Sequence, residues 1–352
     1  MSGLSFLAGI CLSVISVTIA EISCRNEAGD PVDWFVLYKL PMFQINKSAG
    51  SGLDYLYLDS KMQGWQLSKL QINMTESAVG QVLQQLYQTY NKNDTAYMMY
   101  NDAHPQDGNY TTKQGHTKGF LLLDKTQGFW LIHSVPHFPP FPENGYGYPS
   151  TGRLYGQTAI CVTYKYDQFK EIGSQLLYYN PPVYNCSIPD MYKKELWSLN
   201  TICTGSRFPW IEQKRLIPLE SAQGEQFLNF AKSKYYIDDI YTAWIAQQLK
   251  TNLLAESWKP KNTYLPSNCS LQYHVYNIKQ IDLPMRSSFC SHYDHSKWCV
   301  SQTYKDQWTC IGDLNRYPYQ IFRSGGFICT QNKIIYNAFR KMVADCYNCT
   351  SS

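Results

Sequence analysis

The segment Gly115-His116-Thr117-Lys118-Gly119 decides the fold because its pattern returns far along the chain. Trp130-Leu131-Ile132-His133-Ser134 begins 14 residues after His116. Near the other end, Asp294-His295-Ser296-Lys297-Trp298 is followed by Trp308-Thr309-Cys310-Ile311-Gly312, which begins 13 residues after His295. The two histidines are 179 residues apart, roughly half of the chain beyond residue 20. This weak internal repeat predicts two similar α/β halves that face each other.

The His-x-Lys pattern suits chemistry on phosphate. In extended backbone, a histidine and the lysine two residues later project from the same face. Lysine offers a compact positive charge to phosphate oxygens, and histidine can attack phosphorus or deliver a proton. A single His-x-Lys is typical of a solvated surface pair, but two at half-chain spacing favour one composite site. The candidate catalytic residues are therefore His116, Lys118, His295 and Lys297, and this chemistry needs no metal or other cofactor.

Residues beside the motifs are candidates for supporting roles. His133 follows the first motif closely and is predicted to assist it. Asn315 and Arg316, which follow Gly312-Asp313-Leu314, either bind phosphate or form a turn with a surface arginine. Asp294 precedes His295 and could orient a histidine, although adjacent residues of a strand point to opposite faces.

Other catalytic patterns do not occur in the sequence. It has no His-Glu-x-x-His, no clustered Asp and Glu set of the kind that two-metal nucleases use, no Gly-x-Ser-x-Gly and no glycine-rich phosphate loop. Cys346 and Cys349 have a metal-like spacing, but near an exported C-terminus they indicate disulfides. The net charge of +4 is too mild to indicate a nucleic-acid partner by itself.

Hydrophobic spacing predicts an alternation of strands and helices. Runs of apolar residues bounded by Gly, Pro and Asp predict strands, and apolar residues at helical spacing predict helices. The region rich in Pro, Gly and Tyr at 136–150 is expected to form a loop beside the site. Strands are predicted at 33–38, 53–58, 96–100, 120–123, 129–134, 159–164 and 271–278, and helices around 79–90, 237–249 and 335–342.

Cysteines and glycosylation sequons indicate the secretory route. Eleven of the twelve cysteines lie after residue 20, which is typical of a chain folded in an oxidising compartment. Seven Asn-x-Ser/Thr sequons occur, including Asn46 and Asn348. The sites expected to carry glycans are Asn73, Asn93, Asn109, Asn185 and Asn268.

The first twenty residues are uncharged and largely apolar. They predict a signal peptide over 1–20, with a small residue available at the cleavage position. The run lacks a positive start, so an uncleaved anchor is the alternative, although the run is short for a membrane span. No later segment is apolar enough to cross a bilayer. The mature chain is therefore expected to have no stable membrane association.

Several motifs resemble those of the deoxyribonuclease II family. The resemblance spans nearly the whole of residues 21–352, which are expected to form one catalytic domain. The segments that carry it include Val32-Asp33-Trp34-Phe35, Gly115-His116-Thr117-Lys118-Gly119, Gly128-Phe129-Trp130-Leu131-Ile132-His133-Ser134, Leu265-Pro266-Ser267-Asn268-Cys269 and Asp294-His295-Ser296-Lys297-Trp298-Cys299.

The resemblance implies an α/β, phospholipase D-like fold. Its two pseudo-symmetric halves, about 21–165 and about 166–352, would each hold a mixed β-sheet flanked by helices. It also implies metal-independent endonucleolytic cleavage of double-stranded DNA at acid pH, leaving 3′-phosphate and 5′-hydroxyl ends. The implied location is the lysosome, with possible secretion, and the implied state is a monomer or homodimer.

The same resemblance suggests roles and pairings. His116 would attack phosphorus and His295 would protonate the leaving oxygen. Disulfides are implied for Cys24 with Cys161, for Cys310 with Cys329, and for Cys269 with either Cys346 or Cys349. The pair Cys186–Cys203 is predicted only from its closeness in sequence.

The sequence departs from the wider phospholipase D pattern. That pattern has an acidic residue five positions after each lysine, where this chain has Leu123 and Gln302. Two other functions therefore stay open on the same fold. One is a catalytically silent protein that binds DNA or phospholipid, and the other is a phosphodiesterase acting on lipid.

Overall fold

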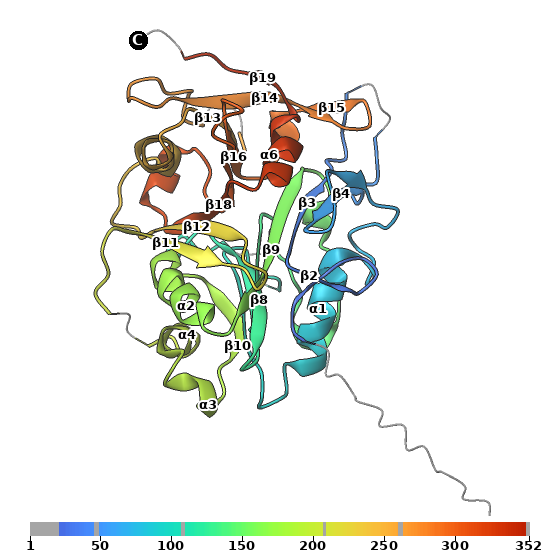
Figure 1. Ribbon diagram of the computed structural model, residues 1–352, viewed down its shortest axis with the longest axis vertical. Coiled ribbons are helices and arrows are strands. Elements are labelled where there is room, and N and C mark those ends of the chain that lie inside the picture. The colour runs from blue at the N-terminus through green and yellow to red at the C-terminus, as the bar shows by residue number, and fades with distance from the viewer. Residues whose placement is uncertain (1–20, 46–48, 107–109, 207–208, 260–262, 350–352) are drawn as a thin grey trace, which may run out of the picture.

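Two large β-sheets carry the two His-x-Lys motifs (Figure 1). The computed structural model describes residues 21–45, 49–106, 110–206, 209–259 and 263–349. The predicted signal peptide at 1–20 and the sequons at Asn46 and Asn109 lie outside the described residues.

The first sheet has the strand order β10-β6-β7-β8-β9-β3-β4-β5. Every adjacent pair in it is antiparallel. A small separate sheet pairs β1 (Cys24–Arg25) with β2 (Pro31–Val32). The strands of the first sheet are β3 (Trp34–Lys39), β4 (Tyr55–Asp59), β5 (Gln66–Leu67), β6 (Ala96–Asn101), β7 (Lys118–Leu123), β8 (Gln127–His133), β9 (Gln157–Lys165) and β10 (Val183–Ser187).

The second sheet has the order β11-β12-β18-β17-β16-β13-β14-β15, with β19 paired to β14. Only β13 and β14 run parallel, joined through residues 257–274. Its strands are β11 (Lys214–Glu220), β12 (Gln226–Lys232), β13 (Leu253–Glu256), β14 (Val275–Leu283), β15 (Ser287–Cys290), β16 (Trp298–Ser301), β17 (Thr309–Gly312), β18 (Gly325–Thr330) and β19 (Val343–Cys346).

The expectation of a mixed sheet in each half is therefore wrong for the first sheet and confirmed for the second. Parallel neighbours need a crossover of about a dozen residues or more. The segment 257–274 provides one, whereas β6, β7, β8 and β9 follow one another along the chain as antiparallel neighbours.

Each sheet contains four adjacent antiparallel strands in a comparable arrangement, which we call its four-strand run. In the first sheet the run is β6-β7-β8-β9 and is followed in the chain by α2 (Gln168–Tyr179). In the second sheet it is β13-β16-β17-β18 and is followed by α6 (Lys333–Arg340). The two motifs lead into β7 and β16, which are the second strands of their runs.

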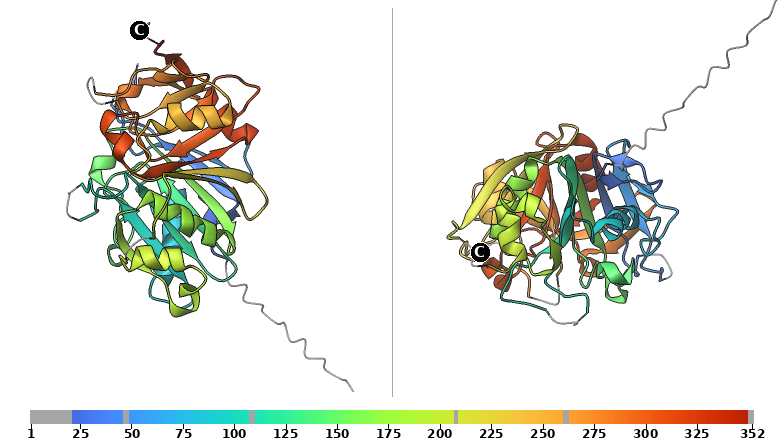
Figure 2. Two further views of the ribbon diagram at one scale, coloured as in Figure 1. Left: turned by 90° about the vertical axis from the view of Figure 1, so that its left-hand side faces the viewer. Right: turned by 90° about the horizontal axis from the view of Figure 1, so that it is seen from below.

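The main core lies between the two sheets and includes residues of α2 and α6. The two sheets can be followed side by side in the views of Figure 2. Trp130 of β8 and Trp298 of β16 are both fully buried in it. A second core packs α1 (Ala78–Thr89) on the outer face of the first sheet. A third packs the π-helical turn η3 (Ile240–Ile245) and α5 (Ala246–Leu249) on the outer face of the second.

Helix ends follow local capping. Ser77 begins α1 by accepting a hydrogen bond from Gly80 N at 3.1 Å. The helix predicted over 237–249 begins at Ile240, because Asp239 caps it through Tyr241 N. The predicted strand 271–278 begins at Val275 instead, since backbone hydrogen bonds between Asn268 and Val275 close the preceding residues into a turn. Shorter helices are α3 (Asp190–Lys193) and α4 (Trp197–Cys203).

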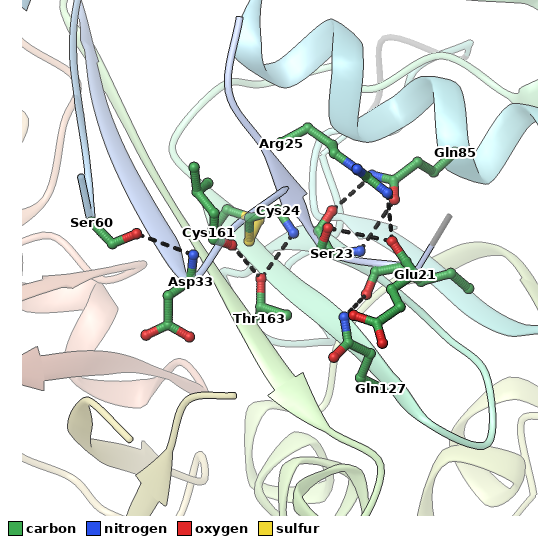
Figure 3. Close-up of a disulfide and its surroundings, with 12 residues drawn as sticks. Glu21, Ser23, Cys24, Arg25, Asp33, Ser60, Gln85, Gln127, Cys161 and Thr163 are labelled. Carbon is green, nitrogen blue, oxygen red and sulfur yellow. Dashed lines mark hydrogen bonds between the residues drawn. A yellow bond between two sulfur atoms is a disulfide. The ribbon is translucent and has the colours of Figure 1, made fainter. Parts of the chain in front are cut away.

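Four disulfides join the described residues. Cys24–Cys161 links β1 to β9 across 137 residues, and Thr163 accepts the Cys24 amide at 3.0 Å beside it (Figure 3). Cys186–Cys203 and Cys310–Cys329 are present as predicted. Cys269 pairs with Cys349, so the assignment of Cys346 to a disulfide is wrong. Cys346 is held in β19 opposite Ile278, and the chain reaches Cys269 only beyond that strand.

The surface positions of the sequons differ. Asn73 and Asn93 are exposed, whereas Asn185 and Asn268 are half-buried. In the latter two, the side-chain oxygen accepts hydrogen bonds, from Tyr97 and from Ser270 respectively. Glycosylation at these four sites stays a prediction. Within the described part of the chain, no helix has the length and apolar character of a membrane span.

Candidate functional site

The two motifs lie where β7 and β16 begin, and both are largely buried. His116 and His295 are each 8 % exposed, and Lys118 and Lys297 are 2 % and 1 % exposed. Buried cationic side chains are costly unless an anion or hydrogen-bond acceptor faces them. The motifs are therefore not the solvated surface pairs that a single tripeptide would suggest.

Each histidine is held by the opposite sheet. His116 Nδ1 lies 2.7 Å from the backbone oxygen of Asp313, the residue that follows β17. His295 Nδ1 lies 3.0 Å from the backbone oxygen of Ser134, the residue that follows β8. A carbonyl accepts, so Nδ1 carries the proton in both rings. The Nε2 atoms are thereby left for chemistry.

The motif backbones are held in the same reciprocal way. His116 N donates to Ser324 O at 2.9 Å, directly before β18. His295 N donates to Gly156 O at 2.9 Å, directly before β9. Each motif is thus fixed by two loops of the other sheet, which brings the two predicted His-x-Lys elements to one place.

The charges of the two motifs act on one another. Burial and the charge of Lys118 lower the pKa of His116 well below its ordinary value, and Lys297 adds to the effect. Burial, Lys297 and Lys118 likewise lower the pKa of His295. Both rings are therefore predominantly neutral near pH 7 in the absence of a bound anion.

Asp102 is a site residue that the motif analysis missed. It directly follows β6, is 1 % exposed and forms an ion pair with Lys118. Its Oδ2 lies 3.8 Å from His116 Nε2 and 3.5 Å from Arg323 Nη2. Burial opposes its ionisation, but Lys118 and His116 outweigh this and hold the pKa of Asp102 at about 2. A negative charge therefore persists beside the first motif at acid pH.

Lys297 has different surroundings. Its Nζ donates to the backbone oxygen of His295 and lies 3.3 Å from His295 Nδ1. Within the described residues, no carboxylate lies within 4.0 Å of its ammonium group. Burial, together with the charge of Lys118, lowers the pKa of Lys297 well below its ordinary value. An incoming anion would therefore stabilise the charged form of Lys297 strongly.

Aromatic and amide side chains enclose the second histidine. The ring centroid of Trp258 lies 5.2 Å from that of His295, and that of Tyr155 lies 6.5 Å away. Gln157 Oε1 lies 3.2 Å from His295 Nδ1 and accepts the hydroxyl of Ser134 at 2.5 Å. Gln157 was also missed by the motif analysis.

The neighbours of the motifs have mainly supporting positions. Asn315 Oδ1 accepts Trp258 N at 3.2 Å, and the ring of Trp258 packs beside that of His295. His133 Nδ1 accepts Val135 N at 3.1 Å, and its ring packs against Phe120 and Phe138. Burial lowers the pKa of His133 to about 3. Within the described residues its Nε2 is buried without a hydrogen-bond partner, so His133 has no hydrogen bond to either motif histidine.

Asp294 and Arg316 are each held in buried hydrogen bonds to residues other than the two motif histidines. Asp294 is fully buried, where it accepts hydrogen bonds from the hydroxyls of Tyr38 and Ser296. Arg316 is 1 % exposed and donates to Asp239 at 3.1 Å and to Asn277 at 2.6 Å. Both predicted roles of Arg316, phosphate binding and a surface turn, are therefore wrong.

Asp313 contributes a second buried carboxyl group. Its Oδ1 accepts Lys118 N at 3.4 Å, and its Oδ2 is buried with no hydrogen-bond partner. Burial raises the pKa of Asp313 to about 8 despite the opposing charge of Lys118. Across the described ranges, no group of three or more His, Cys, Asp or Glu side chains is placed to hold a metal ion.

Comparisons with known proteins agree along most of the chain. A family model described as Deoxyribonuclease II matches residues 23–349. The chain is 56 % identical to Deoxyribonuclease-2-beta of Homo sapiens over 92 % of this chain and 91 % of that protein. It is 39 % identical to Deoxyribonuclease-2-alpha of Mus musculus over 96 % of each. It is 35 % identical to Plancitoxin-1 of Acanthaster planci over 98 % of each.

Proposed function

Because the chain belongs to the deoxyribonuclease II family, we propose that it is an acid endodeoxyribonuclease. Its substrate is double-stranded DNA, and its products carry 3′-phosphate and 5′-hydroxyl ends. One observation carries this proposal. The Nδ1 atom of each histidine is hydrogen-bonded to a backbone oxygen of the opposite sheet. This arrangement leaves two Nε2 atoms and two lysines for one phosphodiester.

In the first step, His116 Nε2 attacks phosphorus. A P–N bond forms and the P–O5′ bond breaks, while the proton on His295 Nε2 passes to O5′ and gives the 5′-hydroxyl. Lys118 and Lys297 stabilise the charge that develops on the non-bridging oxygens. Asp102 positions Lys118 through their ion pair.

In the second step, water replaces the histidine. Its oxygen bonds to phosphorus, one of its protons passes to His295, and the P–N bond breaks. The 3′-phosphate leaves, and His116 is again neutral and His295 again protonated. All charge stabilisation in this scheme comes from side chains, so no metal or cofactor is required.

The lowered pKa of His295 gives a reason for acid operation. The general acid must be protonated, and a lowered pKa means that its protonated fraction rises only as the pH falls. The phosphate charge offsets that of the lysines and makes this proton easier to retain. His116 must be neutral, so activity falls again at very low pH.

The two four-strand runs support a phospholipase D-like arrangement of pseudo-symmetric halves. The disulfides and sequons support passage through the secretory route to the lysosome, with possible secretion. His133 and Asn315 are proposed as auxiliary residues, His133 near Lys118 and Asn315 through Trp258. The proposed state in solution is a monomer or a homodimer, which size-exclusion chromatography with light scattering distinguishes.

Nicking of supercoiled plasmid at about pH 5 in EDTA tests this function. Purified protein should nick the plasmid, and His116→Ala and His295→Ala should each slow nicking at least about a hundredfold. His274→Ala is a matched control, because His274 is half-buried beside Tyr276, away from both motifs. Cleavage abolished by EDTA, or cleavage that survives both substitutions, would contradict the mechanism. DNA binding without cleavage would indicate a silent member, and cleavage of lipid esters alone a lipid enzyme.

A further inference from the structure

Two cavities adjoin the backbone that carries the first motif. One has a volume of about 670 Å³, and its lining includes Trp210, Lys234 and Tyr235. The other has a volume of about 390 Å³, and its lining includes Gln114. Asn180 lines both, so the two cavities are neighbours at that residue. We call the two together the flanking cavity.

The wall of the flanking cavity is hydrogen-bonded to the residues at the start of the first His-x-Lys motif. Asn180 O accepts Gly115 N at 2.8 Å, and Ser324, which also lines the cavity, accepts His116 N at 2.9 Å. Arg323 Nε donates to Gln114 O at 3.0 Å, and Arg323 Nη2 lies 3.5 Å from Asp102 Oδ2. Arg323 therefore connects the cavity lining to the ion pair between Asp102 and Lys118. A strand of DNA with its phosphate at His116 would therefore pass this cavity with a neighbouring nucleotide.

The lining suits a nucleotide. Trp210 is 86 % exposed and Tyr235 is 56 % exposed, so both aromatic side chains of the lining are open to solvent. Such large exposed apolar groups are typical of binding surfaces. Lys234 lies beside them, with its ammonium 5.3 Å from the centroid of Tyr235. Among the described lining residues of both cavities there is no carboxylate, which suits a chain of phosphates.

We infer that the flanking cavity is a subsite for a nucleotide of the substrate strand that has turned out of the base stack beside the scissile phosphate. A base offers its face to an aromatic ring only when it leaves the duplex stack. Trp210 and Tyr235 supply the stacking faces, and Lys234 contacts a neighbouring phosphate. This subsite rests on the proposed function, because it assumes DNA at the two histidines.

Binding to an inactive background separates this role from catalysis. The affinity of His116→Ala protein for a 30-base-pair duplex is measured by fluorescence anisotropy at several salt concentrations. Adding Trp210→Ala should raise the Kd about tenfold with no change in its salt dependence, since stacking involves no ion release. Adding Lys234→Ala should lower the salt slope by about 0.9, as expected for one lost phosphate contact.

Two comparisons make the result specific. Trp197→Ala is the matched control, because Trp197 is 45 % exposed on α4 and lines neither cavity. A duplex with a one-nucleotide bulge has a base already free to turn out, so it should bind more tightly than a paired duplex. That advantage should disappear in Trp210→Ala.

Each outcome bears on one proposal. The subsite proposal is overturned by any of three results: an unchanged Kd in Trp210→Ala, an equal change in Trp197→Ala, or no preference for the bulged duplex. In each case, plasmid nicking by the parent protein still supports the proposed function. If the parent protein neither binds nor cleaves DNA, the proposed function fails and the subsite fails with it.

Discussion

The ring of His116 is oriented by the backbone oxygen of Asp313, which lies 197 residues further along the chain and 2.7 Å from its Nδ1. The ring of His295 is oriented by the backbone oxygen of Ser134 in the same manner. A carbonyl fixes the tautomer whatever side chain the acceptor residue carries. The site therefore has two similarly prepared histidines, and their roles must be separated by chemistry.

A substrate with sulfur in place of the 5′-oxygen separates the two roles. A thiolate leaves without protonation, so such a substrate bypasses the general acid but still needs the nucleophile. His295→Ala should cleave the sulfur substrate within about tenfold of the parent rate, although its cleavage rate on the ordinary substrate falls by about 10²-fold or more. His116→Ala should cleave neither. Rates are measured by release of free thiol in single-turnover assays.

The opposite pattern would exchange the assigned roles. Rescue of His116→Ala with no rescue of His295→Ala would make His295 the nucleophile. The control is a substrate with sulfur at the 3′ position, in which the leaving 5′-oxygen is unchanged. Neither variant should cleave this substrate faster than the ordinary one.

Asp102→Asn should change the acid side of the pH profile. The Asp102 charge raises the pKa of His116, and its own pKa of about 2 keeps that charge present throughout the working range. Its removal lowers the pKa of His116, so the ring stays neutral to lower pH and the acid limb of the profile moves to lower pH. The profile of kcat/KM against pH measures this shift.

Asp33→Asn is the matched control for that variant. Asp33 is 4 % exposed and accepts the hydroxyl of Ser221 at 2.6 Å, outside the site. Its substitution should leave the acid limb in place. A shift of the alkaline limb in Asp102→Asn would instead mean that His116 supplies the proton.

Lys297→Met should affect both rate and pH dependence. Lys297 is the largest charge that lowers the pKa of His295, so its loss raises that pKa and moves the alkaline limb of the profile to higher pH. The missing charge at phosphate should reduce kcat/KM by about 10²–10³. The same pH series detects both effects. Lys279→Met, at an exposed pair with Asp345, should change neither, and an unaltered alkaline limb in Lys297→Met would disprove the coupling.

The double substitution Cys24→Ser with Cys161→Ser should lower stability markedly. The bond closes 137 residues and fastens the N-terminal segment to β9. Its loss should reduce the free energy of unfolding by about 2–5 kcal/mol. Denaturant titration under non-reducing conditions measures this. Cys290→Ser, at an exposed unpaired thiol, should change the free energy of unfolding by less than about 0.5 kcal/mol, and equal losses would contradict the assignment.

Strongly patterned parts of the fold could be predicted from sequence. The strands from Ala96 to Ser134 and helix α1 were found because their apolar residues alternate or recur at helical spacing. Helix α2 was overlooked although Phe169, Ile172 and Leu176 are buried at helical spacing. That pattern was present in the sequence and could have been used.

The site could be predicted only where a motif marked it. His116, Lys118, His295 and Lys297 were identified by their repetition, and the structure places them together. Asp102 and Gln157 lie outside the motifs, at the end of one strand and the start of another, and their closeness depends on how the two sheets meet. Arg316 was misassigned because sequence does not show that Asp239 and Asn277 enclose it.

The exchange of carbonyl acceptors between the sheets constrains how this chain can change. A shift of the loop after β8 would misdirect His295, and a shift of the loop after β17 would misdirect His116. A change in the length of one of these loops therefore disturbs the histidine of the other half. The two halves therefore cannot be replaced independently of each other. Insertions that are tolerated in evolution should lie outside these two loops.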